Sequence, residues 1–382
     1  MTDMNNAAAD SAARKDSKTL EMAAKLAIPK PGSRIAKTFA FGRDILRSPL
    51  VLQAGRAAEE VARDNPDELS VFFLDGELHK KRRGQIARYF TPKAMRDRYH
   101  PVMVSATESL IADLRKKGSR QLDLISFDLA CDVASVIVGL TNSEPRAMAL
   151  RILAFFKGAR EEQGPLQKIF DEMDVMPAVE ARRKQRQDDV ISLLLDLNYS
   201  HDAILSECLT YASAGMMTTR EFIVAVSWHL FENAELREKY LNGSEEVQFG
   251  ILDEILRLDP VVTHIHRRAT EDFVTSDGEQ VKKGELLAIE LRSANLDEAM
   301  TGPDPLIVDP ERGKRQRMTS AWMSFGDGPH RCPGAQVALH ETRIFVDALL
   351  RVPGVRMSKP PVPRWTGTAY ELHDAIIECD PI

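Results

Sequence analysis

The sequence predicts a mainly α-helical protein with a small β portion, and three observations support this fold class. Apolar residues recur at helical spacing along most of the 382 residues. Runs that alternate like strands are few and short. The composition, with 43% hydrophobic and 28% charged residues, is that of an ordinary globular chain. We therefore expect helices packed around one core.

The start of the chain differs in composition from the rest. Residues 1–28 are polar and rich in Ala, Lys and Asp, which predicts a disordered or weakly ordered tail. Beyond it there is no linker rich in Gly, Ser or Pro, and no internal repeat. We therefore expect residues 29–382 to form a single domain, although the length alone would allow two or three.

Helical periodicity places the elements in order. Helices are expected at 51–65, 77–89, 93–117, 128–140, 144–161, 177–197, 201–233, 244–257 and 335–350. Strands are expected at 273–275, 280–281 and 286–289, with another near residue 376. Residues 295–324 follow neither period. Irregular segments of that length are uncommon unless they have a structural or functional role.

Charge and cysteine content exclude several classes of protein. A net charge of −6 gives no overall attraction to nucleic acid or to an anionic membrane. The N-terminus lacks the apolar run of a signal peptide or a membrane anchor. The cysteines at positions 131, 208, 332 and 379 are too scattered for a disulfide framework or a zinc site, which favours a reducing compartment. We therefore expect a cytoplasmic protein.

A cysteine follows a glycine-rich loop and precedes a helix-forming stretch. The run 325–335 reads Phe-Gly-Asp-Gly-Pro-His-Arg-Cys-Pro-Gly-Ala. A cysteine binds iron as the thiolate, and a helix start supplies free backbone N–H groups and a positive dipole end that favour this anion. Pro333 suits a first helical position, and Gly334 permits close approach to a flat cofactor. A buried cysteine in a loop-to-helix turn is the alternative for an isolated Cys-Pro-Gly.

The full run resembles the haem-thiolate loop of the cytochrome P-450 family. The resemblance extends over roughly residues 30–382 and implies the fold of that family, a triangular helical prism around haem. It implies haem b as the cofactor and Cys332 as the axial ligand of its iron. Phe325 and Gly334 then lie beside the haem.

A second segment matches the same family on the helix around residue 215. A mid-helix glycine costs about 1 kcal/mol relative to alanine, and Thr218 can return its hydroxyl to the carbonyl of Ala214. Ala214, Gly215 and Thr218 resemble the oxygen-binding helix, but Met217 stands where an acid is usual. Methionine cannot relay a proton. Glu221 lies on the same face as Thr218 and could substitute through water, or it could be an ordinary solvated charge.

A third match is Glu254-Ile-Leu-Arg257, an acid and an arginine one helical turn apart. Alone, such a pair is usually a solvated surface contact. The resemblance gives it a structural role instead, in which it locks the irregular segment behind the cysteine loop. The third partner should be an arginine, either Arg312 or Arg317.

A fourth match concerns the haem propionates. His79 and Arg83 lie four residues apart on one helix face. The resemblance implies that they bind the propionates together with Arg267 and His330. Arginine suits this role because its planar fork matches a carboxylate. A basic surface helix is the alternative interpretation.

The remaining cations of this helix predict a docking surface. Lys80, Lys81, Arg82, Arg88 and Lys93 form a basic stretch in an acidic protein. We interpret them as a surface for an acidic electron carrier, against the alternative of an ordinary solvated face.

The resemblance implies a monooxygenase. Such an enzyme takes electrons from a ferredoxin- or flavodoxin-type partner with its NAD(P)H reductase, and inserts one oxygen atom from dioxygen into an apolar small molecule. The pocket residues that we expect, each of which could instead be part of the core, are Tyr211, Met217, Val262, Thr263, His264 and Thr366. Two alternatives stay open. Met217 favours a peroxide-using or oxidative-coupling enzyme, whereas a haem sensor or carrier would need no turnover.

Overall fold

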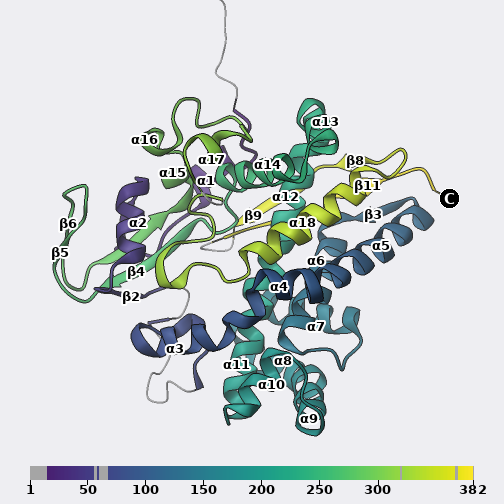
Figure 1. Cartoon of the computed structure of the whole chain (residues 1–382), viewed down its shortest axis with the longest axis horizontal. Coiled ribbons are helices and arrows are strands. Elements are labelled where there is room, and N and C mark those ends of the chain that lie inside the picture. Colours follow the sequence, from purple (N-terminus) through teal and green to yellow (C-terminus); the bar gives the residue numbers. More distant parts are fainter. Residues whose placement is uncertain (1–14, 56–57, 60–67, 319–320, 366–368, 382) are drawn as a thin grey trace, which may run out of the picture.

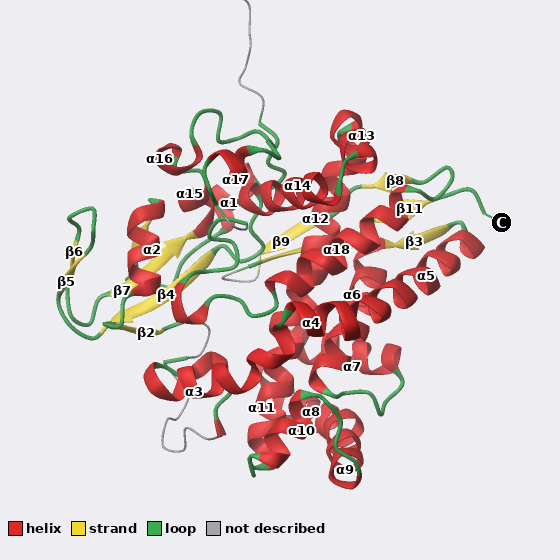
Figure 2. Ribbon diagram, in the orientation of Figure 1, coloured by secondary structure: helices red, strands yellow, loops and turns green. Residues whose placement is uncertain are grey.

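The computed structural model describes residues 15–55, 58–59, 68–318, 321–365 and 369–381 (Figure 1). Helices form the body of the molecule, and small sheets lie on either side of it (Figure 2). The predicted fold class, mainly α with a small β portion, is therefore confirmed. Within the described residues no helix combines the length and the apolar character needed to cross a membrane.

The helices and strands have the following bounds. The helices are α1 (Leu20–Leu26), α2 (Phe39–Arg47), α3 (Gly76–Ile86), α4 (Pro92–Ala94), α5 (His100–Lys117), α6 (Leu122–Val138), α7 (Pro145–Lys157), α8 (Arg160–Phe170), α9 (Met176–Lys184), α10 (Val190–Asp196), α11 (His201–Tyr211), α12 (Thr218–Glu232), α13 (Ala234–Asn242), α14 (Glu245–Leu258), α15 (Leu291–Asn295), α16 (Glu298–Thr301), α17 (Arg312–Arg315) and α18 (Ala335–Leu350). The strands are β1 (Arg34–Ala36), β2 (Val51–Gln53), β3 (Ser119–Gln121), β4 (His264–Ala269), β5 (Phe273–Val274), β6 (Gln280–Val281), β7 (Leu286–Glu290), β8 (Arg356–Lys359), β9 (Val362–Trp365), β10 (Tyr370–His373) and β11 (Ile376–Glu378).

One long helix forms the centre of the molecule. α11 and α12 run end to end, joined by a π-helical segment, Ala212–Met217. α12 is buried around most of its circumference, as expected for a helix inside a large core. It packs against α6, α14 and α18, and α18 also contacts α5. The central helix is therefore fixed from several sides, and its π segment is a local departure inside a rigid frame.

The largest sheet lies beside this body and positions β4. Its strand order is β1-β7-β4-β2, with β1 parallel to β7 and the other pairs antiparallel. Its core is a separate apolar cluster that includes Phe39, Ile45, Ile289 and Trp322. The β9–β10 hairpin approaches the end of β4 through a bridge between Val262 and Ala369.

Several predicted elements differ from the observed ones. The helix expected at 51–65 is wrong over Val51–Gln53, which form edge strand β2, and residues 60–67 lie outside the described part. The helices expected at 144–161 and 177–197 are each interrupted, because Gly158 ends α7 and residues 185–189 separate α9 from α10. β4 was not predicted, since its buried histidines and arginines hide the strand pattern.

The N-terminal segment is ordered from residue 15 onward, so the tail predicted over residues 1–28 is too long. Asp259, buried at 1% exposure, accepts hydrogen bonds from Ser17 Oγ at 2.7 Å and from the amide and hydroxyl of Thr19 at 3.0 and 2.6 Å. Helix α1 follows directly. The polar composition of this segment suggested disorder, but its hydroxyl groups donate hydrogen bonds to Asp259, a buried acid far away in the sequence. Residues 1–14 lie outside the described part.

Candidate functional site

The cysteine loop is folded tightly against the start of α18. The Cys332 amide donates to the Phe325 carbonyl at 2.9 Å, which closes the loop. Gly326 and Gly328 have φ of 69° and 65°, in the left-handed region. A Cβ on Gly328 would stand 2.1 Å from the Leu46 carbonyl oxygen, so this position requires glycine. The loop therefore presents Cys332 from a backbone with little freedom.

The Cys332 thiol lies in surroundings that a metal would complete. Burial raises the pKa of Cys332, whereas the backbone N–H groups of Gly334 and Ala335 and the nearby Arg83 and Arg331 act to lower it. The helix start predicted to favour a thiolate is thus present. Burial outweighs these contributions, so a metal cation bound to the sulfur would be needed to hold it as an anion.

Four predicted propionate ligands come together beside this loop. The rings of His79 and His330 stack with centroids 3.9 Å apart. Arg83 and Arg267 lie close enough to act on both imidazoles, and the Arg83 guanidinium donates to the carbonyl of Arg331. They come from three separate segments, α3, β4 and the cysteine loop, and α3 lies more than 180 residues before the other two. The structure confirms that they form one cluster.

The cluster carries more positive than negative partners. Burial lowers the pKa of His79 to about 4, with His330 and Arg83 adding to the effect, and lowers the pKa of Arg267 to about 10. Asp75 opposes these shifts and pairs with His330 Nε2 at 3.4 Å. Two further carboxylates would balance the site.

These residues fit haem b. Its propionates match the basic cluster, and its iron matches Cys332. The central helix also has accessible surface where the cofactor would lie. Ala214 is exposed and Gly215 and Thr218 are partly exposed, although the helix runs through the core. Among the described residues, a Cβ on Gly215 would meet only the Cβ of Ala134, at 3.8 Å. An exposed position in a central helix indicates an internal opening beside it.

The oxygen-binding segment is distorted at the predicted place. The Thr218 hydroxyl donates to the Ala214 carbonyl at 2.6 Å, as its spacing predicted, and residues 212–217 form a π helix rather than an α helix. Such segments are rare and often occur at functional sites. Met217 is partly buried, and Met216 is fully buried, with its sulfur 3.7 Å from Cys131 Sγ.

Glu221 is held away from the role that its spacing suggested. It is 2% exposed, so it is not a solvated charge. Its carboxylate accepts a hydrogen bond from Arg220 and, at 2.6 Å, one from the Leu372 amide of β10. Burial raises its pKa to about 7, against the effect of Arg220. Both carboxylate oxygens are thus engaged, and neither contacts Thr218.

The residues expected in the substrate pocket are found in several settings. Tyr211 is stacked against Phe90 at 6.3 Å, and its buried hydroxyl has no hydrogen-bond partner among the described residues. Thr263 and His264 are buried at the start of β4, where their side chains contact each other at 3.2 Å. Val262 is partly buried beside them. Thr366 lies outside the described residues.

The Glu254–Arg257 pair is fully buried and bound to the irregular segment. Arg257 Nε and Nη2 contact the two Glu254 oxygens at 2.7 and 2.8 Å, and Arg312 Nε reaches Oε2 at 3.1 Å. Trp322 Nε1 also donates to Glu254, at 3.2 Å. Arg257 binds three carbonyls of the segment between 2.6 and 3.3 Å. Arg312, rather than Arg317, is therefore the third partner.

One buried ion pair was missed and corrects the predicted docking surface. Arg82 is 2% exposed and contacts Glu207 at 2.8 Å, so it does not belong to the surface stretch. The same Glu207 oxygen accepts the Val71 amide at 2.9 Å, and Thr210 donates to Ser70 at 2.7 Å. The pair joins α3, which carries His79, to α11. The sequence did offer one signal for this pair: Glu207 is a charged residue within a largely apolar part of the predicted 201–233 helix.

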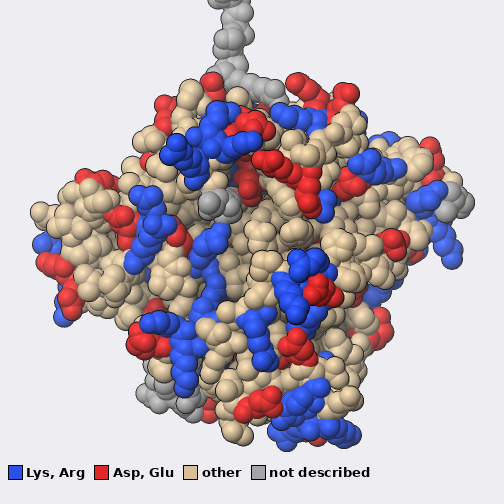
Figure 3. Space-filling model, viewed as in Figure 1, with Lys and Arg blue, Asp and Glu red and all other residues tan. Residues whose placement is uncertain are grey.

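The other cations of the stretch are at the surface. Lys80, Lys81, Arg88 and Lys93 are exposed, and Lys80 approaches Glu77 at 3.7 Å. Figure 3 shows Lys and Arg side chains, with acidic ones among them, on the face that carries α3 and the start of α18. In the same view the chain that leads into α18, which contains the cysteine loop, passes above α3 (Figure 1).

Comparisons with known proteins agree with this geometry. The cytochrome P-450 family model matches residues 250–361, which include the Glu254–Arg257 pair and the cysteine loop. The chain is 27% identical over 330 residues to nocardicin C N-oxygenase of Nocardia uniformis subsp. tsuyamanensis, covering 81% of this chain and 78% of that protein. It is 25% identical over 293 residues to cyclomarin C epoxidase CymV of Salinispora arenicola, covering 72% and 71%.

A solved structure gives the same result for the fold. The crystal structure of CalO2 superposes with a TM-score of 0.80 at 21% identity, covering 95% of this chain and 94% of that one. The cysteine loop, the basic cluster and the buried glutamate–arginine pair are thus found together on the corresponding fold. The chain belongs to the cytochrome P-450 family and is a haem b monooxygenase of the bacterial type.

Proposed function

We propose that this enzyme inserts one oxygen atom from dioxygen into a small or medium-sized apolar organic molecule, with electrons from a ferredoxin- or flavodoxin-type donor and its NAD(P)H reductase. The observation that carries the proposal is the distorted central helix, with Thr218 beside an internal opening. Haem b supplies the reduction and activation of dioxygen when it is bound.

The chain's own residues hold the cofactor and control access to it. Cys332 would bind the iron through a sulfur stabilised by the backbone N–H groups at the start of α18. His79, Arg83, Arg267 and His330 would bind the propionates. Phe325 and Gly334, both half-buried in the loop, would lie along the cofactor face.

Proton supply is where this chain departs from the usual pattern. Thr218 is the hydroxyl next to the opening, and it can both donate and accept a hydrogen bond once it leaves the Ala214 carbonyl. Met217 can neither donate a proton nor relay one. Because Arg220 and β10 hold the Glu221 carboxylate, we expect water or a substrate group to supply Thr218, with Glu221 acting mainly in the fold.

The substrate is expected to be largely apolar. In the pocket as we propose it, Met217, Val262 and the ring of Tyr211 would supply apolar surface, whereas Thr263 and the Tyr211 hydroxyl would offer a few polar contacts. Sites of this type bind by apolar burial and use a small number of polar groups for orientation. His264 would add one neutral imidazole, because burial lowers its pKa.

A peroxide-using or oxidative-coupling enzyme is the second proposal, and Met217 is the observation that favours it. Purified holoenzyme should be assayed with a ferredoxin, its reductase and NAD(P)H, and separately with hydrogen peroxide alone. Turnover only with the reductase supports the first proposal. Turnover only with peroxide supports the second, and no turnover in either assay would favour a sensor or carrier.

The electron donor can be tested in the same assay. Exposed charges act over about 8–10 Å at ordinary ionic strength, so added salt should slow reduction of the wild-type enzyme. Lys80→Gln with Lys81→Gln should reduce the rate at low salt and weaken its salt dependence. Lys239→Gln with Lys314→Gln, on α13 and α17, is the matched control pair. A rate that does not depend on salt would contradict docking at this face.

A further inference from the structure

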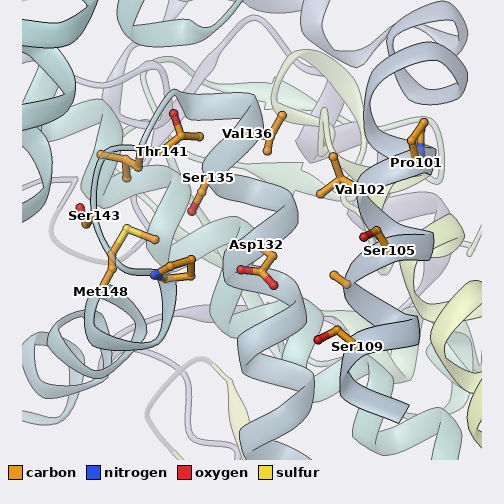
Figure 4. A pocket seen from close by; sticks show the side chains of 13 residues that line it. Pro101, Val102, Ser105, Ser109, Asp132, Ser135, Val136, Thr141, Ser143 and Met148 are labelled. Carbon is orange, nitrogen blue, oxygen red and sulfur yellow. The ribbon is translucent and has the colours of Figure 1, made fainter. Parts of the chain in front are cut away.

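A cavity of about 540 Å³ lies between α5, α6 and the start of α7, and it shares no residue with the haem or substrate sites described above (Figure 4). Small side chains on α5, among them Ser105 and Ser109, leave it wide on one side. Its walls are largely apolar, with Val102, Val136 and Met148. Its volume is in the range of small-molecule sites.

One carboxylate points into this cavity. Figure 4 shows Asp132 on α6 facing the space toward Ser105 and Ser109. Asp132 is half-buried, and no hydrogen bond or ion pair to its carboxylate is found among the described residues. Burying part of a carboxylate without a partner costs free energy, and a bound cation would lower that cost.

A second acid lies behind Asp132. Glu341 on α18 is 2% exposed, and its Oε1 atom is buried without a hydrogen-bond partner. Asp132 acts directly on it, and together with burial this raises the pKa of Glu341 to about 8. Native proteins leave few buried polar atoms unsatisfied, and each such atom needs an explanation. Because Glu341 with this pKa is largely protonated near pH 7, Asp132 is the acid that brings negative charge to the cavity.

We propose that this cavity binds a small organic cation of the guanidinium or ammonium type. Its charged head would pair with Asp132 and donate to Ser105 and Ser109, and its apolar body would lie against Val102 and Met148. A single carboxylate within apolar walls suits such a molecule better than a metal ion, which needs several oxygen ligands.

The site has a direct path to the central helix. Cys131 immediately precedes Asp132 on α6, and its sulfur lies 3.7 Å from the sulfur of Met216 in the π segment. Ser135, which also lines the cavity, donates to the Cys131 carbonyl at 2.5 Å. A bound cation would therefore be linked to the distorted segment through one layer of side chains.

The test uses a probe that cannot ligate haem iron. N-Hexylguanidinium carries a permanent charge without a free amine lone pair, and N-hexylurea is its neutral isostere. Calorimetric titration of the holoenzyme is expected to show hexylguanidinium binding at least fivefold more tightly than hexylurea. Equal affinity for the two probes, or absence of binding by hexylguanidinium, would overturn the proposal.

Two variants locate the charge. Asp132→Asn is expected to weaken hexylguanidinium binding about tenfold or more, since truncating a partly buried charge partner removes most of such an interaction. Asp128→Asn, one turn away on α6 and outside the cavity lining, is the matched control and should change affinity less than twofold at pH 8, where Asp132 is ionised with or without Asp128. Wild-type affinity in Asp132→Asn, with an unchanged melting temperature, would place the cation elsewhere.

The pH dependence of binding gives an independent check of the role of Asp132. Burial and Asp128 raise the pKa of Asp132 to about 6, Glu144 acts in the same direction, and Arg146 opposes them. Hexylguanidinium binding should therefore be present above pH 6 and be lost as the pH falls through this value. Ser105→Leu, which fills the cavity without changing charge, should block binding at every pH. A pH-independent affinity in the wild type would contradict the role of Asp132.

Discussion

The buried pair between Arg82 and Glu207 permits a sharp test of how the haem-binding helix is held. In Glu207→Ala the Arg82 guanidinium keeps its charge at 2% exposure, and the Val71 amide loses its acceptor. Breaking a buried ion pair by removing one partner costs about 3–5 kcal/mol, and an orphaned buried amide about 1–3 kcal/mol. Arg82 can still reach the Leu69 carbonyl at 3.4 Å and the Tyr199 ring at 4.0 Å. We therefore expect the free energy of unfolding to fall by about 3–5 kcal/mol.

The double variant Arg82→Met with Glu207→Leu separates charge from position. Replacing both members of a buried pair by apolar side chains is often close to neutral for stability, so it should recover most of the loss. Val71 remains without its acceptor, so the turn that it begins should stay loosely held against α11. Asp188→Ala breaks the exposed contact with Arg98 at 2.8 Å and is the control, expected to cost less than about 1 kcal/mol.

Urea unfolding followed by circular dichroism measures these differences, and haem content after purification reports the consequence for α3, which carries His79 and Arg83. Glu207→Ala should lose haem as well as stability. A loss below about 1 kcal/mol in Glu207→Ala would refute the reasoning, because it would mean that the pair is solvated or exchanged for other partners.

The remaining predictions concern the ligand, proton supply and pH. Cys332→Ser should abolish the red-shifted absorption band of the reduced, CO-bound protein, because a hydroxyl is a much poorer anionic ligand; an unchanged band would contradict the ligand assignment. Met217→Glu should raise the product formed per NAD(P)H and Thr218→Ala should lower it, with Met217→Gln as the control; equal yields in all variants would exclude this helix from proton control. Lowering the pH from 6.5 toward 4 should destabilise the apoprotein by up to about 3 kcal/mol through His79, whose folded pKa of about 4 lies below its unfolded value, so the unfolded chain takes up the proton first. The His79→Gln apoprotein should lose less stability over this range, and identical profiles for the two proteins would remove the assignment.

Those parts of the site that depend on short segments could be predicted from the sequence. The cysteine loop, the backbone contact of Thr218 and the pairing of Glu254 with Arg257 each involve residues within one turn or one loop, where spacing determines geometry. The basic cluster needed the family resemblance, because nothing local connects α3 to β4. Its confirmation shows that the distant matches belong to one fold.

What the sequence could not supply was the direction in which a charged side chain points. Lys80, Lys81, Arg82 and Arg83 are consecutive, yet Arg82 is buried against Glu207 while both lysines are exposed. Glu221 likewise has the spacing of a relay acid, but its carboxylate accepts hydrogen bonds from Arg220 and from the backbone of β10 instead. Each outcome depends on a partner that is more than 100 residues away or on another element, and no periodicity encodes such a partner.

The charge balance at the site links cofactor binding to folding. Four basic groups are gathered around Asp75, and burial keeps His79 largely neutral because a proton there would lack sufficient compensation. Two propionates would supply that compensation and raise the pKa of His79, so the acid sensitivity of the apoprotein should shrink in the holoprotein. A ligand that binds the folded state alone also stabilises it by mass action. Haem should therefore raise the free energy of unfolding and also reduce its dependence on pH between 4 and 6.5. When His79 is replaced, haem should still raise the free energy of unfolding but should no longer change its pH dependence.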